Sequence, residues 1–332
     1  MKKISLLVLI LFLTIILFEL FLRFSPFSYG ITPMIYDKDI GMWHKKDFSN
    51  YIIKDCYKTK YYFDSYGRIE NNYKYDDQKK DIVLMGDSQV EALMVNNKNI
   101  MHNSLFNELD GKYNVLNYGL SGTGPSQQLE ILKHKVNLKN IDTLVHFIFL
   151  ENDLNDGDPN NFNGSNRPKV YTNFINLNNY KIIKPIEYNL KESFRDFLGK
   201  FELYVYLKKT LYFYKIFLYD LLGVEKKTTH IVKHNIRNEK YKWLQLEGSL
   251  YQIKKITKNL KINYNIVIVS NNVNNMKKLE IFLNNYHIKY LNLSPFLLNL
   301  QKQQQISFSC DGHWNGVTHK EIAKYLKGNL NL

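Results

Sequence analysis

Residues 81–95 read DIVLMGDSQVEALMV, and this stretch decides the fold. A short apolar run ends at Gly86, Asp87 and Ser88, and a helical pattern follows at once over residues 89–109. Short apolar runs that end in turn residues are typical of buried strands. The stretch therefore predicts a strand, a tight corner and a helix, with Ser88 at the corner.

The same alternation of strand and helix extends on both sides of a long interruption. Short apolar runs bounded by helical patterns are typical of βαβ units, in which a parallel sheet is covered by helices on both faces. The sequence therefore predicts an α/β fold with a parallel sheet. The further strands are expected at 113–119, 142–150, 264–270 and 288–294, and the further helices at 125–136, 245–260, 274–285 and 316–326.

The interruption covers about residues 155–244, which is long for a connection. Within it, residues 190–223 are helix-prone, aromatic and basic. They suit a lid, an interfacial membrane element or a small core of their own. Ahead of the sheet, residues 24–80 predict an extended arm, so that the main domain spans residues 81–330.

The N-terminus predicts a membrane anchor over residues 1–23. An apolar run from Ile4 to Leu22 follows Lys2 and Lys3, and it is long enough to cross the hydrocarbon layer as a helix. The segment after it has no small-x-small cleavage site, which favours an uncleaved anchor over a removed signal peptide. The two lysines place the N-terminus in the cytoplasm and the remaining chain on the other side.

Composition excludes several classes of protein. The 332 residues carry a formal charge of +14, but the lysines are scattered and form no basic stripe, so nucleic acid is not an expected partner. No zinc spacing and no P-loop is present, and we expect no cofactor.

The sequence has two cysteines, Cys56 and Cys310. Two free thiols are the default expectation, and one bridge in an oxidising compartment is the alternative.

Five candidate functional residues lie where the predicted strands end or the predicted helices begin. Ser88 follows the first strand, Gly122 the second and Asn152 the third, while Asp311 and His313 precede the last helix. Taken alone, each residue also fits a purely structural role, as a helix cap, a turn residue or a surface histidine. The carboxyl ends of parallel strands form one edge, however, and ligands bind there.

Together these residues have the composition of an acyl-transfer site. Ser88 is the expected nucleophile, His313 its general base and Asp311 the group that orients the imidazole. Gly122 and Asn152 are the expected oxyanion donors, in addition to the Ser88 N–H. The run NDLNDGD (152–158) departs by one residue from a calcium loop, so we expect no metal site there.

These segments resemble the four blocks of the SGNH (GDSL-type) hydrolase family: GDSQ (86–89), NYGLSGTG (117–124), END (151–153) and DGHWN (311–315). The resemblance implies a flavodoxin-like three-layer α/β/α sandwich, and it assigns the five residues the roles just given. Many members have glycine where this chain has Glu151. The Asp-x-His-Trp-Asn block is similar to that of membrane-anchored, alginate O-acetyltransferase-type members.

The expected function is a serine ester hydrolase that acts outside the cytoplasm on acyl esters of carbohydrate or lipid. Two alternatives remain open: a polysaccharide O-acetyltransferase with the same triad, and a non-catalytic SGNH-like scaffold. Glu151 is the only residue that favours the scaffold, because a carboxylate pointing inward disfavours a nearby oxyanion.

Overall fold

The computed structural model describes residues 2–25, 33–158, 168–185, 194, 197–221 and 239–330. The chain divides into two compact units. One contains Met1–Pro33, Asn50–Ile52 and Tyr188–Asn235, and the other contains the sheet and everything packed on it.

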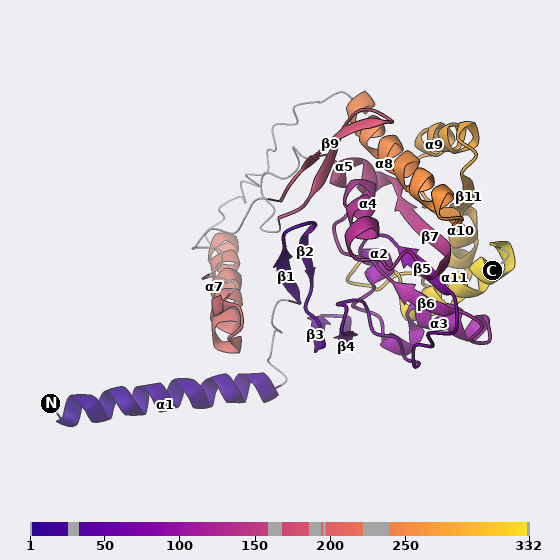
Figure 1. Cartoon of the computed structure of the whole chain (residues 1–332). Coiled ribbons are helices and arrows are strands. Elements are labelled where there is room, and N and C mark those ends of the chain that lie inside the picture. The colour runs from indigo at the N-terminus through magenta and orange to yellow at the C-terminus, as the bar shows by residue number, and fades with distance from the viewer. Residues whose placement is uncertain are drawn as a thin grey trace. The chain divides into compact units, whose positions relative to one another are not determined.

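The larger unit is built on a five-stranded sheet in which every neighbouring pair is parallel (Figure 1). The spatial order β6-β5-β7-β10-β11 is the flavodoxin-like order 2-1-3-4-5. The predicted α/β class and parallel flavodoxin-like sheet are therefore confirmed. The strands are β5 (Asp81–Met85), β6 (Asn114–Asn117), β7 (Ile141–Phe149), β10 (Asn263–Val269) and β11 (Lys289–Asn292).

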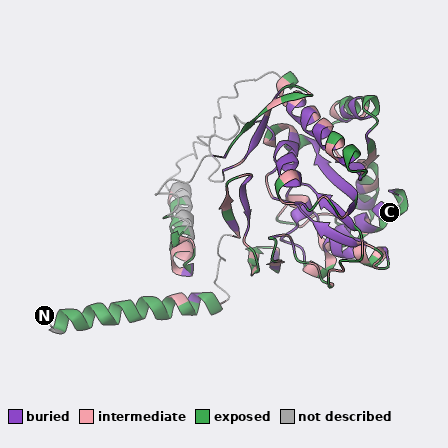
Figure 2. Ribbon diagram, viewed as in Figure 1, coloured by how far each residue is buried: buried purple, intermediate pink, exposed green. Residues whose placement is uncertain are grey.

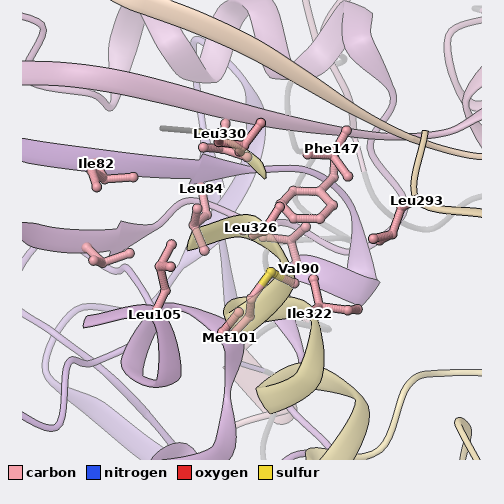
Figure 3. Close-up of a cluster of buried hydrophobic side chains, with 14 of the residues drawn as sticks. Ile82, Leu84, Val90, Met101, Leu105, Phe147, Leu293, Ile322, Leu326 and Leu330 are labelled. Atoms are coloured by element: carbon pink, nitrogen blue, oxygen red, sulfur yellow. The ribbon is translucent and has the colours of Figure 1, made fainter. Parts of the chain in front are cut away.

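Both faces of the sheet are buried, which explains the unbroken apolar runs (Figure 2). Alternate residues of β5 and β7, such as Ile82, Leu84 and Phe147, join one cluster with α3 (Met101–Glu108) and α11 (Gly316–Asn329) (Figure 3). The opposite face is covered by α4 (Pro125–His134) and α8 (Glu239–Asn259), which pack against each other. The central strands of the sheet are therefore covered by helices on both sides.

The single helix predicted over 89–109 is wrong. The chain forms a short α2 (Ser88–Glu91), then a 3-10 turn η1 (Asn97–Asn99), and only then α3. The helix stops because Ala92 adopts a left-handed conformation with φ 54°. A second start follows at Asn96, whose side chain accepts a hydrogen bond from the Lys98 N–H.

The remaining elements of the larger unit connect or extend this core. The helix predicted from residue 245 begins earlier, since α8 starts at Glu239. Between the third strand and α8, the described residues form an antiparallel hairpin of β8 and β9. These elements are α5 (Leu150–Asp156), β8 (Tyr171–Asn176), β9 (Asn179–Ile183), α9 (Val273–Asn285) and α10 (Ser294–Gln303).

The arm ahead of the sheet is folded into two pairs of short strands, β1–β2 and β3–β4. The default expectation of two free thiols is wrong, because Cys56, in the turn between β3 and β4, forms a disulfide with Cys310. This bridge ties the arm to the segment that contains Asp311 and His313. The strands are β1 (Met34–Asp37), β2 (Gly41–His44), β3 (Phe48–Lys54) and β4 (Tyr57–Phe63).

The smaller unit contains α1 (Lys2–Phe24) and α7 (Glu202–Leu221). Residues Lys3–Phe24 are long and apolar enough to cross a membrane, with a mean hydropathy of 2.9. Near the end of α1, the Glu19 carboxylate accepts hydrogen bonds from the Glu202 and Leu203 N–H groups at 3.0 and 2.8 Å. Glu19 thus satisfies two free donors at the start of α7. The predicted segment 190–223 falls partly outside the described residues.

Candidate active site

The corner after β5 presents Ser88 at the first position of α2. Asp87 is the helix N-cap, and its carboxylate accepts a hydrogen bond from the Gln89 N–H at 2.9 Å. Gly86 packs so tightly that a Cβ there would lie 2.5 Å from a methyl group of Val90. The corner is therefore fixed by packing and capping, and the Ser88 N–H is a helix-start donor without an intrahelical acceptor.

Ser88, His313 and Asp311 form one hydrogen-bonded chain. The Ser88 hydroxyl and His313 Nε2 are 2.8 Å apart, and His313 Nδ1 is hydrogen-bonded to Asp311 Oδ1. The Asp311 side chain is 6% exposed and that of His313 is 27% exposed, so the imidazole remains accessible while its partner is enclosed. This is the order of contacts through which a histidine removes a serine proton and a carboxylate fixes the imidazole tautomer.

The second carboxylate oxygen of Asp311 is held by residues of the arm. Lys54 Nζ forms an ion pair with Oδ2, and the Tyr57 hydroxyl donates to the same oxygen at 3.1 Å. Burial alone raises the Asp311 pKa, but the hydrogen bonds from Lys54 and His313 and the charge of His313 outweigh it and hold the pKa well below its usual range. Asp311 is thus a carboxylate at every pH at which a neutral histidine acts as a base.

Gln89 links the helix start to the loop that carries the histidine. Its Oε1 accepts a hydrogen bond from the Trp314 N–H at 2.9 Å, and its Nε2 donates to the Gly312 carbonyl at 3.4 Å. The two contacts bracket His313. The side chain next to Ser88 therefore holds the backbone on both sides of His313.

The two predicted oxyanion donors lie in the loop after β6 and in α5. Gly122 has φ +70°, a conformation that side chains rarely adopt, and a Cβ there would meet only the Lys169 ammonium at 3.7 Å. The loop is joined to the corner because the Leu120 N–H donates to the Gly86 carbonyl at 3.1 Å. Asn152 hydrogen-bonds the Asp87 carboxyl group, so its amide is placed beside the corner that presents Ser88.

Glu151 points away from these donors. Its Oε1 accepts hydrogen bonds from the Ser270 hydroxyl at 2.7 Å and from the Asn271 and Asn272 N–H groups at 2.6 and 3.1 Å. The carboxylate closes the turn after β10. The Glu151 carboxylate is therefore engaged by this turn, and no contact with the two predicted oxyanion donors is seen among the described residues.

Two buried carboxyl groups, Asp87 and Asp153, and the half-buried Asp156 interact with one another near the corner. Burial raises the Asp87 pKa to about 6, although hydrogen bonds from Gln89 and Asn152 lower it. Burial, with the charges of Asp87 and Asp156, raises the Asp153 pKa well above its usual value. Burial likewise raises the Asp156 pKa, which the Lys169 charge lowers. In all three carboxyl groups, burial opposes the charged form, and their mutual repulsion adds to this effect for Asp87 and Asp153.

A second polar chain joins the arm to the nucleophile helix. His44 Nε2 and Glu91 Oε1 are 2.5 Å apart, and the Ser121 hydroxyl donates to the other oxygen of Glu91. His44 Nδ1 lies 2.9 Å from the Gly67 carbonyl, so its hydrogen faces that acceptor. Gly119 makes room for this contact, because a Cβ there would lie 2.2 Å from the Glu91 nitrogen.

The sequence did not predict the supporting residues Lys54, Tyr57, Gln89, His44 and Glu91. Gln89 is the last residue of the quoted GDSQ motif, but nothing in the motif indicated where its amide points. The others had no signal, because each acts through a partner distant in sequence. Within the part of the chain that the structure describes, no group of three or more His, Cys, Asp or Glu side chains is arranged to hold a metal ion.

No family model and no curated protein matches the sequence. A solved member of the lipolytic protein G-D-S-L family from Veillonella parvula is 11% identical, with a TM-score of 0.39 over 76% of this chain and 99% of that chain. The acetyl xylan esterase AlAXEase is 12% identical, with a TM-score of 0.40 over 75% and 99%.

A two-domain esterase active on acetylated mannans is 9% identical, with a TM-score of 0.42 over 76% of this chain and 49% of its own. With identities this low and TM-scores under 0.5, the fold and the site rest on this chain's own contacts. On those contacts, the chain is a parallel α/β protein in which Ser88, His313 and Asp311 form one hydrogen-bonded chain at the carboxyl edge of the sheet.

Proposed function

We propose that this chain is a serine esterase of the SGNH (GDSL) type that acts on O-acyl esters of carbohydrate or lipid. One observation carries the proposal: the Ser88 hydroxyl lies 2.8 Å from His313 Nε2, and Asp311 holds the other ring nitrogen. The non-catalytic alternative loses its support, because Glu151 is engaged by the turn after β10.

The reaction follows from the placement of these groups. His313 Nε2 takes the proton of the Ser88 hydroxyl as its oxygen attacks the ester carbonyl. The N–H groups of Ser88 and Gly122 and the Asn152 amide stabilise the oxyanion, and one such donor is worth about 3–4 kcal/mol. His313 then protonates the departing alcohol. Water, activated by the same imidazole, attacks the acyl-serine and releases the acid.

The first test is turnover of p-nitrophenyl acetate by the full chain in detergent. We expect Ser88→Ala to reduce kcat by at least about 10³-fold, since the acyl-enzyme cannot form. Ser65→Ala, an exposed serine on a turn of the arm, is the matched control and keeps wild-type activity. Equal activity of the Ser88→Ala and wild-type chains refutes the mechanism.

The same preparation distinguishes hydrolysis from transfer. An oligosaccharide acceptor is added, and its acetylation is followed by mass spectrometry. Acetate as the only product supports an esterase. Acetylated acceptor formed by the wild type, and absent with Ser88→Ala, identifies an O-acetyltransferase that uses the same acyl-serine.

We also propose that α1 is a membrane anchor and that the catalytic unit lies outside the cytoplasm. Lys2 and Lys3 support this orientation, and the Cys56–Cys310 disulfide supports an oxidising compartment. A removed signal sequence satisfies the same length and hydropathy. Intact mass of the membrane fraction separates the two, because an anchored chain retains residues 1–23. We expect alkaline phosphatase fused to the C-terminus to be active. Fluorescence from a C-terminal fusion to a reporter that fluoresces only in the cytoplasm contradicts the orientation.

A further inference from the structure

The turn between β3 and β4 lies against the loop that carries the catalytic histidine, residues 306–315, called here the histidine loop. The disulfide between Cys56 and Cys310 joins the two segments covalently. Beside it, the rings of Tyr57 and Phe308 are 5.0 Å apart. The turn is thus fixed to the loop by a bond and by packing, at residues 254 positions apart.

The histidine loop is also ordered within itself. The Phe308 N–H donates to the His313 carbonyl at 3.0 Å, and the Asn315 N–H donates to the Ile306 carbonyl at 3.0 Å. These bonds fix its backbone but leave Asp311 Oδ2 to other donors. The groups that bond this oxygen are the Lys54 ammonium and the Tyr57 hydroxyl.

We propose that Lys54 and Tyr57 are positioning residues of the triad: they hold Asp311 Oδ2 so that Oδ1 faces His313, and the Lys54 charge tunes the proton affinity of the imidazole. This inference rests on the proposed esterase function. Asp311 has two oxygens and one imidazole partner, so a second set of donors prevents rotation of the carboxylate. An ammonium beside the carboxylate offsets part of the negative charge that stabilises an imidazolium.

Other charged groups also face this histidine. Asp87, on the corner before α2, and His319, in α11, both interact electrostatically with His313. Burial raises the pKa of Asp87 to about 6, so Asp87 titrates within the pH range of the activity profile. Both groups remain when Lys54 is changed, and a difference between variants therefore reports Lys54.

The experiment compares the pH dependence of kcat/KM for p-nitrophenyl acetate in Lys54→Met, Lys54→Arg and wild type. Removal of the ammonium increases the negative potential at the imidazole, so we expect the acid limb of Lys54→Met to move upward by about 0.5–1 pH unit. We expect kcat/KM at pH 7 to fall roughly 10-fold, with KM little changed, because misoriented bases slow the chemical step. Lys54→Arg retains the charge and is expected to restore the wild-type limb.

Lys60→Met is the matched control. Lys60 is an exposed lysine on β4, whose ammonium lies 4.9 Å from the ring centre of Tyr62. The substitution removes one charge from the same hairpin without touching Asp311, so its profile is expected to match wild type. Tyr57→Phe removes only a hydrogen bond, and we expect a smaller upward shift than with Lys54→Met.

A Lys54→Met profile that superimposes on those of wild type and Lys60→Met overturns the inference, while serine-dependent turnover by wild type leaves the proposed function standing. If wild type shows no serine-dependent turnover, the proposed function fails. The inference is then tested by NMR titration of the His313 imidazole, assigned with His313→Asn. A titration midpoint at higher pH in Lys54→Met than in wild type supports the inference, and an unchanged midpoint overturns it.

Discussion

At Gly119 the chain after β6 packs directly against the backbone of α2. A Cβ there would lie 2.2 Å from the Glu91 nitrogen and 2.7 Å from the Val90 carbonyl carbon, and both are backbone atoms that cannot rotate away. The absence of a side chain therefore sets the distance between α2 and the loop that holds Gly122. Glycine is required at position 119 because the two backbones approach closely there, and not because of its conformational freedom.

Gly119→Ala is expected to displace α2. We expect the free energy of unfolding to fall by about 1–3 kcal/mol and kcat/KM to fall at least about 10-fold, because overpacking forces the backbone apart and moves Ser88. Urea denaturation and ester turnover measure the two effects. Gly328→Ala, in α11 with open space around its Cβ position, is the control and should be neutral or slightly stabilising. Wild-type behaviour of Gly119→Ala contradicts the packing.

Asp153 is fully buried, with one carboxyl oxygen bonded to the Phe149 N–H at 2.8 Å and the other without a partner among the described residues. Burial raises its folded-state pKa above the unfolded value. The folded state therefore binds the proton more tightly, so this group's contribution to stability is present at low pH and is lost as pH rises from about 4 toward the raised pKa.

Asp153→Asn has no proton to lose. We expect the free energy of unfolding of Asp153→Asn, minus that of wild type, to increase from pH 5 to pH 8. Urea titrations at the two pH values measure this difference. Asp77→Asn, at an exposed position of the arm, should show no comparable trend. A pH-independent difference for Asp153→Asn indicates that the carboxyl group is already ionised at pH 5.

At the scale of elements, the site depends on where α2 ends. The helical pattern continues past residue 92, yet the chain turns there because Ala92 is left-handed and α3 restarts at Met101. Tertiary packing overrides the local pattern: Val90 is buried in the core cluster, and Glu91 is committed to His44. The five strands of the parallel sheet could be predicted from the sequence, and their flavodoxin-like order came with the resemblance. The break after α2 could not be predicted, because its cause lies in contacts with the core and the arm.

The turn after β10 depends on the first turn of α5 through Glu151. We expect Glu151→Ala to lower the free energy of unfolding by about 1 kcal/mol, since three donors lose a charged acceptor at an exposed position. Glu151→Gln retains an acceptor oxygen and should be less destabilised. Both variants should keep kcat within about twofold of wild type. A large gain in kcat with Glu151→Ala indicates instead that the carboxylate faces the oxyanion.

At the scale of the whole molecule, the disulfide closes a loop of most of the chain. Cross-linking residues 254 positions apart restricts the unfolded chain strongly. We expect Cys56→Ser with Cys310→Ser to lower the free energy of unfolding by about 2–5 kcal/mol. Thiol reductant should destabilise wild type to a similar degree and leave the double variant unchanged. Equal stability of oxidised and reduced wild type contradicts a structural role for the bridge.

The five predicted site residues came from motifs whose spacing is local, and the structure places Ser88, His313 and Asp311 in contact. Their catalytic roles stay predictions until turnover is measured. The supporting set came from elsewhere: Lys54 and Tyr57 reach Asp311 across most of the sequence. Hydrogen bonds between distant residues leave no periodicity in a single sequence, so the arm was predicted as an extension and its contribution to the site was not.

The same long-range contact determines when the site can be completed during synthesis of the chain. Cys56 and its neighbours leave the ribosome first, while Cys310 and the triad partners of Ser88 follow 254 residues later. At about 5–20 residues per second, that interval is roughly 13–50 s. Until it ends, Ser88 has neither its base nor the second half of the cross-link. Under the proposed function, a chain still being made therefore has an inert serine until Asp311 and His313 have been synthesised.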